Sequence, residues 1–380
     1  MSRFTVEPAV PQDDADLRRL FAANPMPGEI EVAFHRDPSY FHTTAVQGGF
    51  AQVFLLRDCI TGAAAGVGTR ATRPGYLNGE VREVGYLADL RLDAPYRSGL
   101  LFLEAFRTLA TLHADGRTSL YFTVIAEGNR GAREALEGIS RLRPRADLPC
   151  YRDLGRLLSP AVNLLGRKPP LTPPGCELGR GTAALVPDIV ACLNRNMARR
   201  QFAPHFHISQ FTGGPPEPGY PHLRDLHPHD VYVAVRDGRV VGVLARWDQS
   251  RYKQTVVTAY HGRLSRLRPW LNVGAALLGW PRYPAPGQPV RSVYAAFPAI
   301  DDDDGAILGA LVRALYSDLV GGRHAYFLLG LHARDPLATV LDDYSVTPFA
   351  GRLCAVHFPQ DAPAFALLDD RVPFVELAML

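Results

Sequence analysis

The sequence is poor in cysteine and in lysine, and each shortage narrows what the protein can be. Only five of its 380 residues are cysteines, and they are scattered with no Cys-x-x-Cys pair. An odd, scattered set predicts reduced thiols and argues against a disulfide framework or a thiolate metal site. Lysine occurs only at Lys168 and Lys253, so almost all positive charge is arginine, a bias typical of a GC-rich genome.

Long apolar runs and several familiar motifs are also missing. No stretch reaches the roughly 18 apolar residues of a membrane span, and no charged start precedes an apolar run, so we expect a cytoplasmic protein with no membrane partner. The sequence has no Gly-x-Ser-x-Gly elbow and no Walker loop, which leaves hydrolase and nucleotide-hydrolysing functions without support. The net charge of +3 is small and dispersed, so no nucleic-acid partner is expected.

The length favours two domains of ordinary size. The clearest boundary is the proline-rich segment 167–175, RKPPLTPPG, which is incompatible with a regular helix or strand. We therefore expect an N-terminal domain over 1–166, a linker over 167–175 and a C-terminal domain over 176–380.

The clearest functional pattern lies in residues 84–111. An apolar alternating run ends at Asp93-Ala94-Pro95, a short loop follows as Tyr96-Arg97-Ser98-Gly99, and an apolar-periodic helix comes directly after it. The first N–H groups of a helix are free to bind an anion, and the helix dipole favours negative charge there. The pattern predicts a phosphate or pyrophosphate site, with Arg97 adding positive charge.

This stretch resembles the central motif of the GCN5-related N-acetyltransferases, through Leu90-Arg91-Leu92, Pro95-Tyr96-Arg97 and Gly99. The resemblance implies that the strand pairs with the pantetheine arm of acetyl-CoA and that the loop holds its pyrophosphate. Asn129 matches the asparagine that opens the family's helix after its fifth strand. The tyrosine that often follows seven residues later is Leu136 here, so a thiolate would need another proton donor. The implied acetyl-CoA contacts are Leu90, Arg91, Leu92, Arg97, Ser98, Gly99, Leu100, Leu101 and Asn129.

The order of elements extends the resemblance over about 160 residues. Strand patterns cover 4–9, 51–57, 62–70, 84–92, 119–125 and 150–165, and helical patterns cover 13–21, 29–36, 99–111 and a stretch that Asn129 opens. The second half repeats this order. Its strand patterns lie at 176–180, 230–235, 240–247, 290–300, 324–331, 353–357 and 372–377, and its helical patterns at 187–199, 306–319 and 335–344. The expected fold is α/β (α+β), with two tandem acetyltransferase-like domains, each a mixed central sheet flanked by helices.

Acyl transfer to an amine needs a group that removes the amine's proton, commonly a carboxylate on the central strand. Glu83 and Asp89 are the acidic candidates, and they share the same parity along the strand, which predicts one common face. Each could instead be a charge on the solvent side. Tyr121 and Tyr86 are candidate proton donors, and ordinary aromatic packing is the alternative for both.

Three other segments have a functional and a structural interpretation. The run 301–304, Asp-Asp-Asp-Asp, stands where the second phosphate loop would be; it would repel a pyrophosphate and predicts an exposed acidic helix start, with a metal or cationic-substrate contact as the alternatives. The histidine-rich segment 204–229 is a substrate-gating loop, a zinc site or a plain surface loop. The apolar segment 270–280 lines a substrate pocket or belongs to the core.

The function that these patterns favour is an acyl-CoA-dependent N-acyltransferase, most simply of acetyl groups, acting on a small-molecule or peptide amine. Acetyl-CoA would be the co-substrate, bound once in the N-terminal domain, and no metal is expected. Two alternatives stay open. One is a non-catalytic protein that binds coenzyme A or acts as a scaffold, and the other is an acyl or aminoacyl transferase that uses a different carrier.

Overall fold

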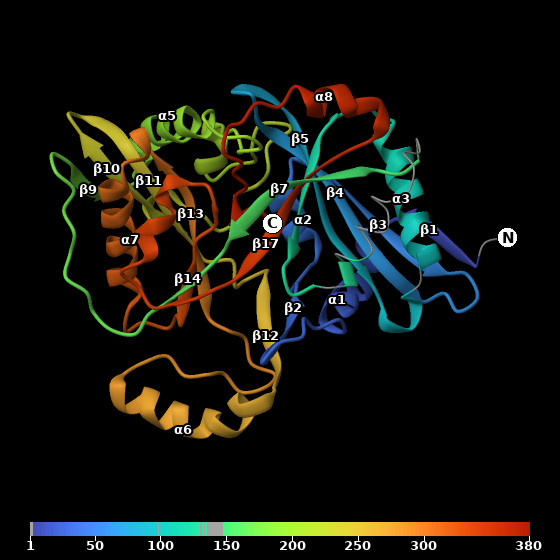
Figure 1. Cartoon of the computed structure of the whole chain (residues 1–380), viewed down its shortest axis with the longest axis horizontal. Helices are drawn as coiled ribbons and strands as arrows, with labels where there is room; N and C mark the ends of the chain where they lie inside the picture. Colours follow the sequence, from blue (N-terminus) through green and yellow to red (C-terminus); the bar gives the residue numbers. More distant parts are fainter. Residues whose placement is uncertain (1–2, 98, 130, 133, 135–146) are drawn as a thin grey trace.

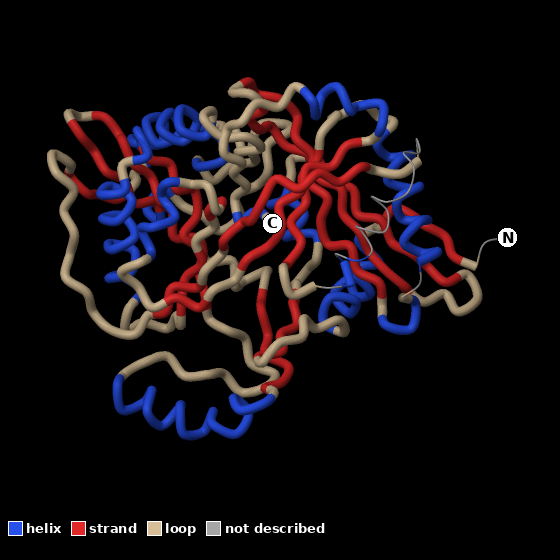
Figure 2. Tube along the Cα trace, in the orientation of Figure 1, coloured by secondary structure: helices blue, strands red, loops and turns tan. Residues whose placement is uncertain are grey.

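The computed structural model describes the chain apart from residues 1–2, 98, 130, 133 and 135–146. Two large sheets lie next to each other, and a two-stranded ribbon carries a helix away from both (Figures 1 and 2). The elements of the first half are β1 (Phe4–Pro8), α1 (Asp14–Ala22), β2 (Ile30–His35), α2 (Phe41–Gln47), β3 (Phe50–Asp58), β4 (Ala64–Leu77), β5 (Glu80–Leu92), α3 (Gly99–His113), β6 (Tyr121–Ala126), β7 (Cys150–Leu158) and β8 (Ala161–Asn163). Those of the second half are β9 (Glu177–Arg180), α5 (Val186–Met197), β10 (Val231–Arg236), β11 (Arg239–Trp247), β12 (Gln254–Tyr260), α6 (Gly262–Leu278), β13 (Ser292–Ile300), α7 (Gly305–Leu319), β14 (Tyr326–Leu328), β15 (Leu331–His332), β16 (Val346–Thr347), β17 (Ala350–His357) and α8 (Ala362–Ala366).

The two sheets are mixed, as the sequence pattern predicts, and each contains a parallel pair of strands. The first sheet has the order β1-β3-β4-β5-β6-β17-β7-β15, and the second has β16-β8-β14-β13-β11-β10-β9. β5 runs parallel to β6, and β13 runs parallel to β14. The mixed α/β architecture expected from the sequence is confirmed, and so is its repetition in the second half.

Each sheet contains a strand from the other half of the chain. β17 lies antiparallel between β6 and β7, where Cys354 faces Thr123 on one side and Asp153 on the other. β8 lies between β14 and β16 in the second sheet. Neither 1–166 nor 176–380 therefore contains all the strands of one sheet, and the division of the chain into two domains stays a prediction.

Helices cover both faces of the first sheet. Adjacent residues of a strand point to opposite faces, and Leu55 and Leu56 of β3 show which helices lie there. Leu55 packs with Leu17 and Phe21 of α1, and Leu56 packs with Leu101 of α3. α1 and α2 thus lie on one face and α3 on the other. No helix in the described part of the chain combines the length and the hydropathy needed to cross a bilayer.

Several sequence-based assignments are wrong where the partner segment is distant. Residues 29–36 form the strand β2 and not a helix, because Ile30, Val32 and Phe34 alternate along a ribbon paired with β12. Residues 372–377 do not form a strand but run as an irregular segment with one bridge to Gln201. Residues 336–341 form a 3₁₀ helix in place of the predicted α-helix at 335–344.

Cutting the chain between residues 170 and 171 should leave both pieces together. The segment is exposed there, with Leu171 44% accessible, while β8 and β17 remain in the opposite sheets. A site-specific protease sequence inserted at this point allows a clean cut. We expect the cut protein to elute as one species at the mass of the intact chain and to separate only in denaturant. Two separate folded fragments in native buffer would contradict the strand exchange.

Candidate active site

The central strand of the first half is broken by a bulge at Asp89. β5 pairs with β4 along most of its length, but the register shifts where Thr69 faces Ala88, and Asp89 has a positive φ of 60°. β5 pairs with β6 only at Gly85 and Tyr86. A bulge bends a strand and ends regular pairing, and bulges are frequent beside active sites. The two parallel strands diverge after Tyr86, which leaves an edge of β5 that can pair with an extended ligand.

The predicted phosphate loop lies directly after this edge, at the start of α3. Arg97 donates from its Nη2 atom to Asn24 Oδ1 over 2.8 Å and remains exposed. Gly99 begins a helix of 15 residues, long enough for a dipole at its N-terminus. Ser98 lies outside the described residues, and the side chain of Leu100 is not described. The described part of this loop is basic at Arg97 and leads into a helix start, as the sequence pattern indicates.

The other residues predicted to contact the coenzyme differ in how deeply they are buried. Leu90 is 38% exposed, whereas Leu101 is buried and packs in the core, so only its backbone could meet a ligand. The Arg91 guanidinium lies 4.3 Å from the ring centre of Phe21, and burial lowers its pKa. Leu92 packs in the cluster that holds Leu101.

Asn129 caps the start of the segment that follows β6. Its Oδ1 atom accepts from the Ala132 N–H over 3.1 Å. The helix predicted beyond this asparagine falls largely on residues outside the described part of the chain.

The prediction that Glu83 and Asp89 share one face of β5 is wrong, because the bulge changes the alternation of side chains between them. Asp89 Oδ2 accepts from Tyr40 Oη over 3.1 Å and from Gln47 Nε2 over 3.0 Å, on the face that α1 and α2 cover. Glu83 instead accepts a hydrogen bond from Thr72. The two carboxylates therefore lie in different surroundings, on opposite faces of β5.

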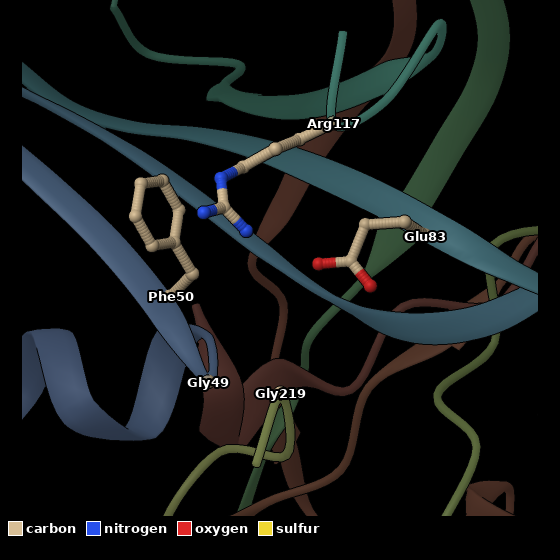
Figure 3. A pocket seen from close by; sticks show the side chains of 5 residues that line it. All are labelled: Gly49, Phe50, Glu83, Arg117 and Gly219. Carbon is tan, nitrogen blue, oxygen red and sulfur yellow. The ribbon is translucent and has the colours of Figure 1, made fainter. Parts of the chain in front are cut away.

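Glu83 lines a cavity of about 470 Å³ together with Arg117, Phe50, Gly49 and Gly219 (Figure 3). Arg117 lies 3.8 Å from the ring centre of Phe50. Gly219 comes from the long loop of the second half, and a Cβ atom on Gly49 would lie 2.0 Å from its backbone. Only glycine permits this approach, so the loop 204–229 closes one side of the cavity.

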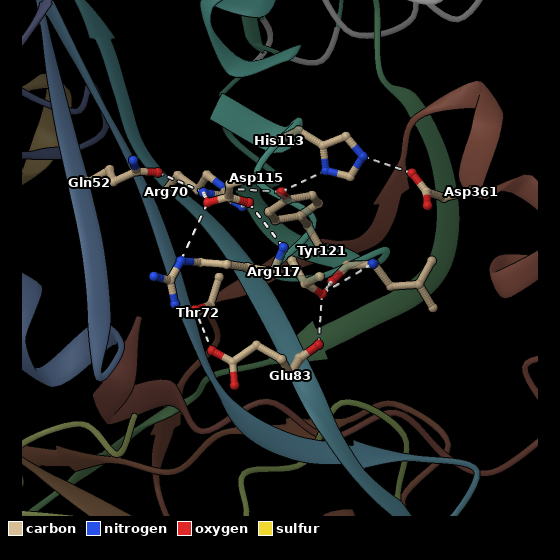
Figure 4. Close-up of polar contacts among 11 residues, drawn as sticks. Gln52, Arg70, Thr72, Glu83, His113, Asp115, Arg117, Tyr121 and Asp361 are labelled. Carbon is tan, nitrogen blue, oxygen red and sulfur yellow. Dashed lines mark hydrogen bonds and ion pairs between the residues drawn. The ribbon is translucent and has the colours of Figure 1, made fainter. Parts of the chain in front are cut away.

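Tyr121 is held in a buried network of hydrogen bonds (Figure 4). Its hydroxyl accepts from Arg70 Nε over 3.0 Å and bonds His113 Nδ1 over 2.9 Å. Arg70 binds both Asp115 oxygens over 2.7 and 2.8 Å, and His113 bonds Asp361 over 2.8 Å. Burial raises the pKa of the Tyr121 hydroxyl. The network links β4, β6 and the end of the chain, which indicates a structural role.

A second group of charged residues meets where the two halves join. We call it the junction cluster, and it consists of Arg36, Arg73, Asp89, Lys253 and Glu376. The sequence analysis found only Asp89, because the others come from distant segments. The low lysine count could have pointed to Lys253, but no local pattern marks Glu376.

The last residues of the chain hold this cluster together. Lys253 Nζ donates to the Leu380 main-chain oxygen over 2.5 Å, and Arg73 Nη1 donates to the Met379 oxygen over 3.4 Å and to the Gln47 oxygen over 3.0 Å. The C-terminal end therefore lies between the two halves, as Figure 1 shows.

Buried polar atoms near the cluster have no partner among the described residues. They are Arg36 Nε, Arg73 Nη2, Gln47 Oε1 and Gln249 Oε1, on side chains that are at most 4% exposed. Such atoms cost free energy unless a ligand or an ordered water satisfies them. At the junction, an ordered water or a polar ligand group could satisfy them.

Burial shifts three groups of the junction cluster, Lys253, Glu376 and Arg73, toward their neutral forms. It lowers the pKa of Lys253 to about 7, with the Arg36 charge acting in the same direction, and raises the pKa of Glu376 to about 7. Burial also lowers the pKa of Arg73 to about 10. Groups that change protonation near neutral pH are suited to proton transfer.

The corresponding strand of the second half is closed by the chain itself. β13 has the same kind of register shift against β11, and Phe297 has a positive φ of 59°. Glu376 Oε2 accepts from the Phe297 N–H over 2.7 Å, and Oε1 accepts from the Ala378 N–H over 3.0 Å. The C-terminal segment thus occupies the region that is open in the first half.

The acidic run at the start of α7 is paired, which corrects the expectation of an exposed one. Asp301 binds Arg195 over 2.8 and 2.9 Å and Asn196 over 2.7 Å. Burial opposes ionisation of Asp301, but these hydrogen bonds outweigh it and lower its pKa. Asp303 pairs with two further arginines, Arg199 and Arg200, and Asp304 caps the helix through the Ala306 N–H. Asp302 alone is exposed.

The histidine-rich loop is fixed by hydrogen bonds. Tyr220 Oη bonds His205 Nδ1 over 2.7 Å, and the His222 N–H donates to the Ala45 oxygen over 2.8 Å. Within the described ranges, no group of three or more His, Cys, Asp or Glu is placed to hold a metal ion. The loop packs the second half against the first.

Comparison with known proteins places this geometry in a fold family. No protein-family model and no curated protein sequence matches the chain. Among solved structures, N-myristoyltransferase from Saccharomyces cerevisiae with bound myristoyl-CoA has a TM-score of 0.61 at 10% identity, over 93% of this chain and 83% of that one. A GCN5-related N-acetyltransferase from Sphaerobacter thermophilus has a TM-score of 0.51 at 12% identity, over 93% and 96% of the two chains. A GCN5-related glucosamine N-acetyltransferase region of a fungal β-N-acetylglucosaminidase has a TM-score of 0.59 at 13% identity, over 93% of this chain and 38% of that one.

The chain has the fold of the GCN5-related N-acetyltransferases, as the sequence motif indicated. The N-myristoyltransferase match runs through both halves, so the two-sheet arrangement is shared with that enzyme.

Lys253 should lose its proton near neutral pH. In protein labelled with ¹³C at the lysine side chains only two sets of signals arise, and Lys168→Arg assigns them. We expect the Lys253 Cε shift to titrate with a midpoint at about 7, so that the amine is charged below and neutral above it. Asp89→Asn removes a carboxylate that favours the charged form and should lower the midpoint further. A midpoint at the ordinary value of 10.5 would refute the enclosed site.

Neutralising the paired aspartates should destabilise the protein, whereas neutralising the exposed one should not. Asp301→Asn combined with Asp303→Asn removes hydrogen bonds to three arginines and should lower the free energy of unfolding by roughly 2 kcal/mol or more. Asp302→Asn is the matched control, since asparagine tolerates its positive φ of 58°, and its effect should stay within about 0.5 kcal/mol. Urea denaturation measures both. Equal effects would mean that the pairing contributes nothing.

Proposed function

We propose that the protein is an acyltransferase that moves an acyl group from coenzyme A to an amine, with acetyl-CoA as the donor. The similar solved structures are described as N-acetyltransferases and as an N-myristoyltransferase with bound myristoyl-CoA, which supports a coenzyme A thioester as co-substrate. The acetyl group comes from the resemblance of residues 90–99 to the acetyltransferase motif.

The observation that carries the proposal is the divergence of β5 from β6 beside the start of α3. An extended ligand arm can pair with β5 at Leu90, Arg91 and Leu92, and the helix start with Arg97 can hold a pyrophosphate. In the second half, Glu376 binds the equivalent strand and the acidic run stands at the helix start. One donor site per chain follows, in the first half.

In this proposal the amine nitrogen forms a bond to the thioester carbonyl carbon, the carbon–sulfur bond breaks, and coenzyme A leaves as a thiolate that takes up a proton. The chain's own residues bind the amine and remove its proton. Asp89 lies at the bulge and faces the junction cluster, where a carboxylate can hold an ammonium group. Lys253, with a pKa of about 7, can then accept the proton near neutral pH. The acceptor would be a small-molecule or peptide amine that enters between the halves.

Glu83 stays a second candidate for the base, because it lines a cavity on the other face of the same strand. Tyr121 is a weaker candidate for the proton donor, since Arg70 and His113 already engage its hydroxyl. Asp89→Asn and Glu83→Gln compared in one assay would decide which carboxylate matters for turnover.

Acetyl-CoA should bind once per chain, and Arg97→Glu should weaken binding at least tenfold because it places a carboxylate beside the pyrophosphate. Isothermal titration calorimetry measures both the stoichiometry and the affinity. Arg82→Glu is the matched control, since Arg82 is exposed at the opposite end of β5 and, among the described residues, forms an ion pair with Glu80. Asp302→Ala tests the second half and should leave binding unchanged. A stoichiometry of two, or equal effects of the Arg97 and Arg82 changes, would contradict the assignment.

The binding titrations, combined with an assay of coenzyme A release, distinguish an enzyme from a non-catalytic binding protein. Release of free coenzyme A in the presence of a mixed set of amines, detected with a thiol reagent, should depend on Asp89 if the protein transfers acyl groups. One-site binding with no release for any amine would favour a sensor or scaffold. Absence of binding would favour a different acyl carrier.

A further inference from the structure

Helix α6 stands away from both sheets at the end of the β2–β12 ribbon (Figures 1 and 2). Its apolar side chains are exposed to an unusual degree, with Leu277 84% and Trp270 76% accessible. The other exposed apolar residues of this arm are Leu267, Leu271, Val273, Leu278 and Trp280. Apolar side chains gathered in one exposed place mark an interaction surface. Apart from Ala275, the segment 270–280 lies outside the core, and Gly279 and Trp280 at its end line a cavity of about 360 Å³.

The opposite side of α6 is fixed by the segment that follows it. Asn272 bonds the Tyr283 backbone twice, over 2.8 and 3.1 Å, and the Arg268 guanidinium lies 5.1 Å from the ring centre of Tyr260. Ala275 is the one buried residue of the helix. The helix is thus held in place from one side, and its apolar face is left outward.

The charge of the segment 249–300, which carries α6, is of one sign, although Glu31 of β2 pairs with it at His261. No aspartate or glutamate occurs between Asp248 and Asp301, although the whole chain has 38 acidic residues. The basic residues of the same interval are Arg251, Lys253, Arg263, Arg266, Arg268, Arg282 and Arg291. Outside this interval the chain has more acidic than basic residues. A partner for α6 must therefore be apolar at its surface and negatively charged.

We infer that α6 is an interfacial helix that docks the protein on an anionic lipid bilayer. A basic helix with tryptophan and leucine on one face lies in the plane of a membrane surface, where tryptophan prefers the boundary between headgroups and acyl chains. The 17 residues of α6 span roughly 25 Å, and Arg263 and Arg266 can extend their charged ends to lipid phosphates. This inference replaces the sequence-based expectation of no membrane partner.

A second copy of the chain fits the same face less well. A symmetric contact would add the basic residues of a second helix to those of the first, with no acidic side chain on either helix to offset them. An anionic bilayer supplies the apolar layer and the negative charge at once.

Vesicle binding tests the inference. The full-length protein is mixed with vesicles of phosphatidylcholine alone or of phosphatidylcholine with phosphatidylglycerol, and sedimentation measures the bound fraction. We expect binding to the mixed vesicles only. Tryptophan emission gives a second readout, because the chain has three tryptophans and Trp247 is buried in the core. A blue shift on vesicle addition therefore reports on Trp270 and Trp280.

Variants separate the apolar from the ionic contribution. Arg263→Gln with Arg266→Gln should weaken binding roughly thirty-fold, since each arginine near an anionic surface contributes about 1 kcal/mol. Trp270→Ser with Leu277→Ser should abolish binding. The matched control is Ile60→Ser with Leu367→Ser, which removes equally exposed side chains, 77% and 74% accessible, outside the arm and should change nothing.

Three results would overturn the inference. The first is absence of binding to either vesicle, and the second is equal binding to neutral and anionic vesicles. The third is a dimer in solution that Trp270→Ser with Leu277→Ser dissociates, which would assign the face to a second copy. None of these results depends on whether acetyl-CoA binds, so failure here and failure of the proposed acyl transfer are distinguishable.

Discussion

The exchange of β8 and β17 between the two sheets is the constraint on which the rest of the structure depends. β17 fills the position between β6 and β7, so the chain that follows it starts inside the first half and returns across the junction. Its last residues then meet Lys253 and Arg73 through main-chain oxygens. The junction cluster therefore exists only when both sheets are complete, which makes the candidate acceptor site a product of the exchange.

The two halves have the same backbone bulge, but the strand edge beside it is open in the first half and bound by the protein's own chain in the second. Asp89 and Phe297 both have positive φ angles, a conformation that non-glycine residues rarely adopt and that clusters at functional sites. In the second half the buried carboxylate of Glu376 satisfies the Phe297 N–H, and the strand is sealed by the protein's own chain. In the first half Asp89 turns its side chain to α2 and the strand edge stays open. In our proposal one copy of the geometry receives a ligand, and the other anchors the segment that completes the junction.

Local patterns predicted what local forces determine. The loop before Gly99, the strands near 230–235 and 240–247 and the helix α7 follow from residue spacing, and the structure has all of them. The strand β2 was missed because its partner β12 lies more than 200 residues further along the chain, and six alternating residues alone do not distinguish a short strand from a helical turn. Nothing in the acidic run itself shows that Arg195 and Arg200 lie opposite it.

The faces of Glu83 and Asp89 were missed for a different reason. Counting parity along a strand assumes an unbroken ladder, and a single bulge reverses the outcome for every residue beyond it. The bulge is invisible in the composition of β5, since it is stabilised by contacts of Asp89 with α2. Such breaks concentrate where a ligand approaches the backbone. Parity arguments are therefore least reliable at the positions where a catalytic side chain is sought.

The segment between Asp248 and Asp301 connects the two places for which we propose a function, the junction cluster and the exposed face of α6. Lys253 stands at the junction, β12 continues from it along β2 of the other half, and α6 follows at the far end. Because the ribbon pairs Gln254 with His35 and Val257 with Val32, it is built from both halves and cannot move with one alone. A helix held at a charged surface would therefore fix the orientation of the junction relative to that surface.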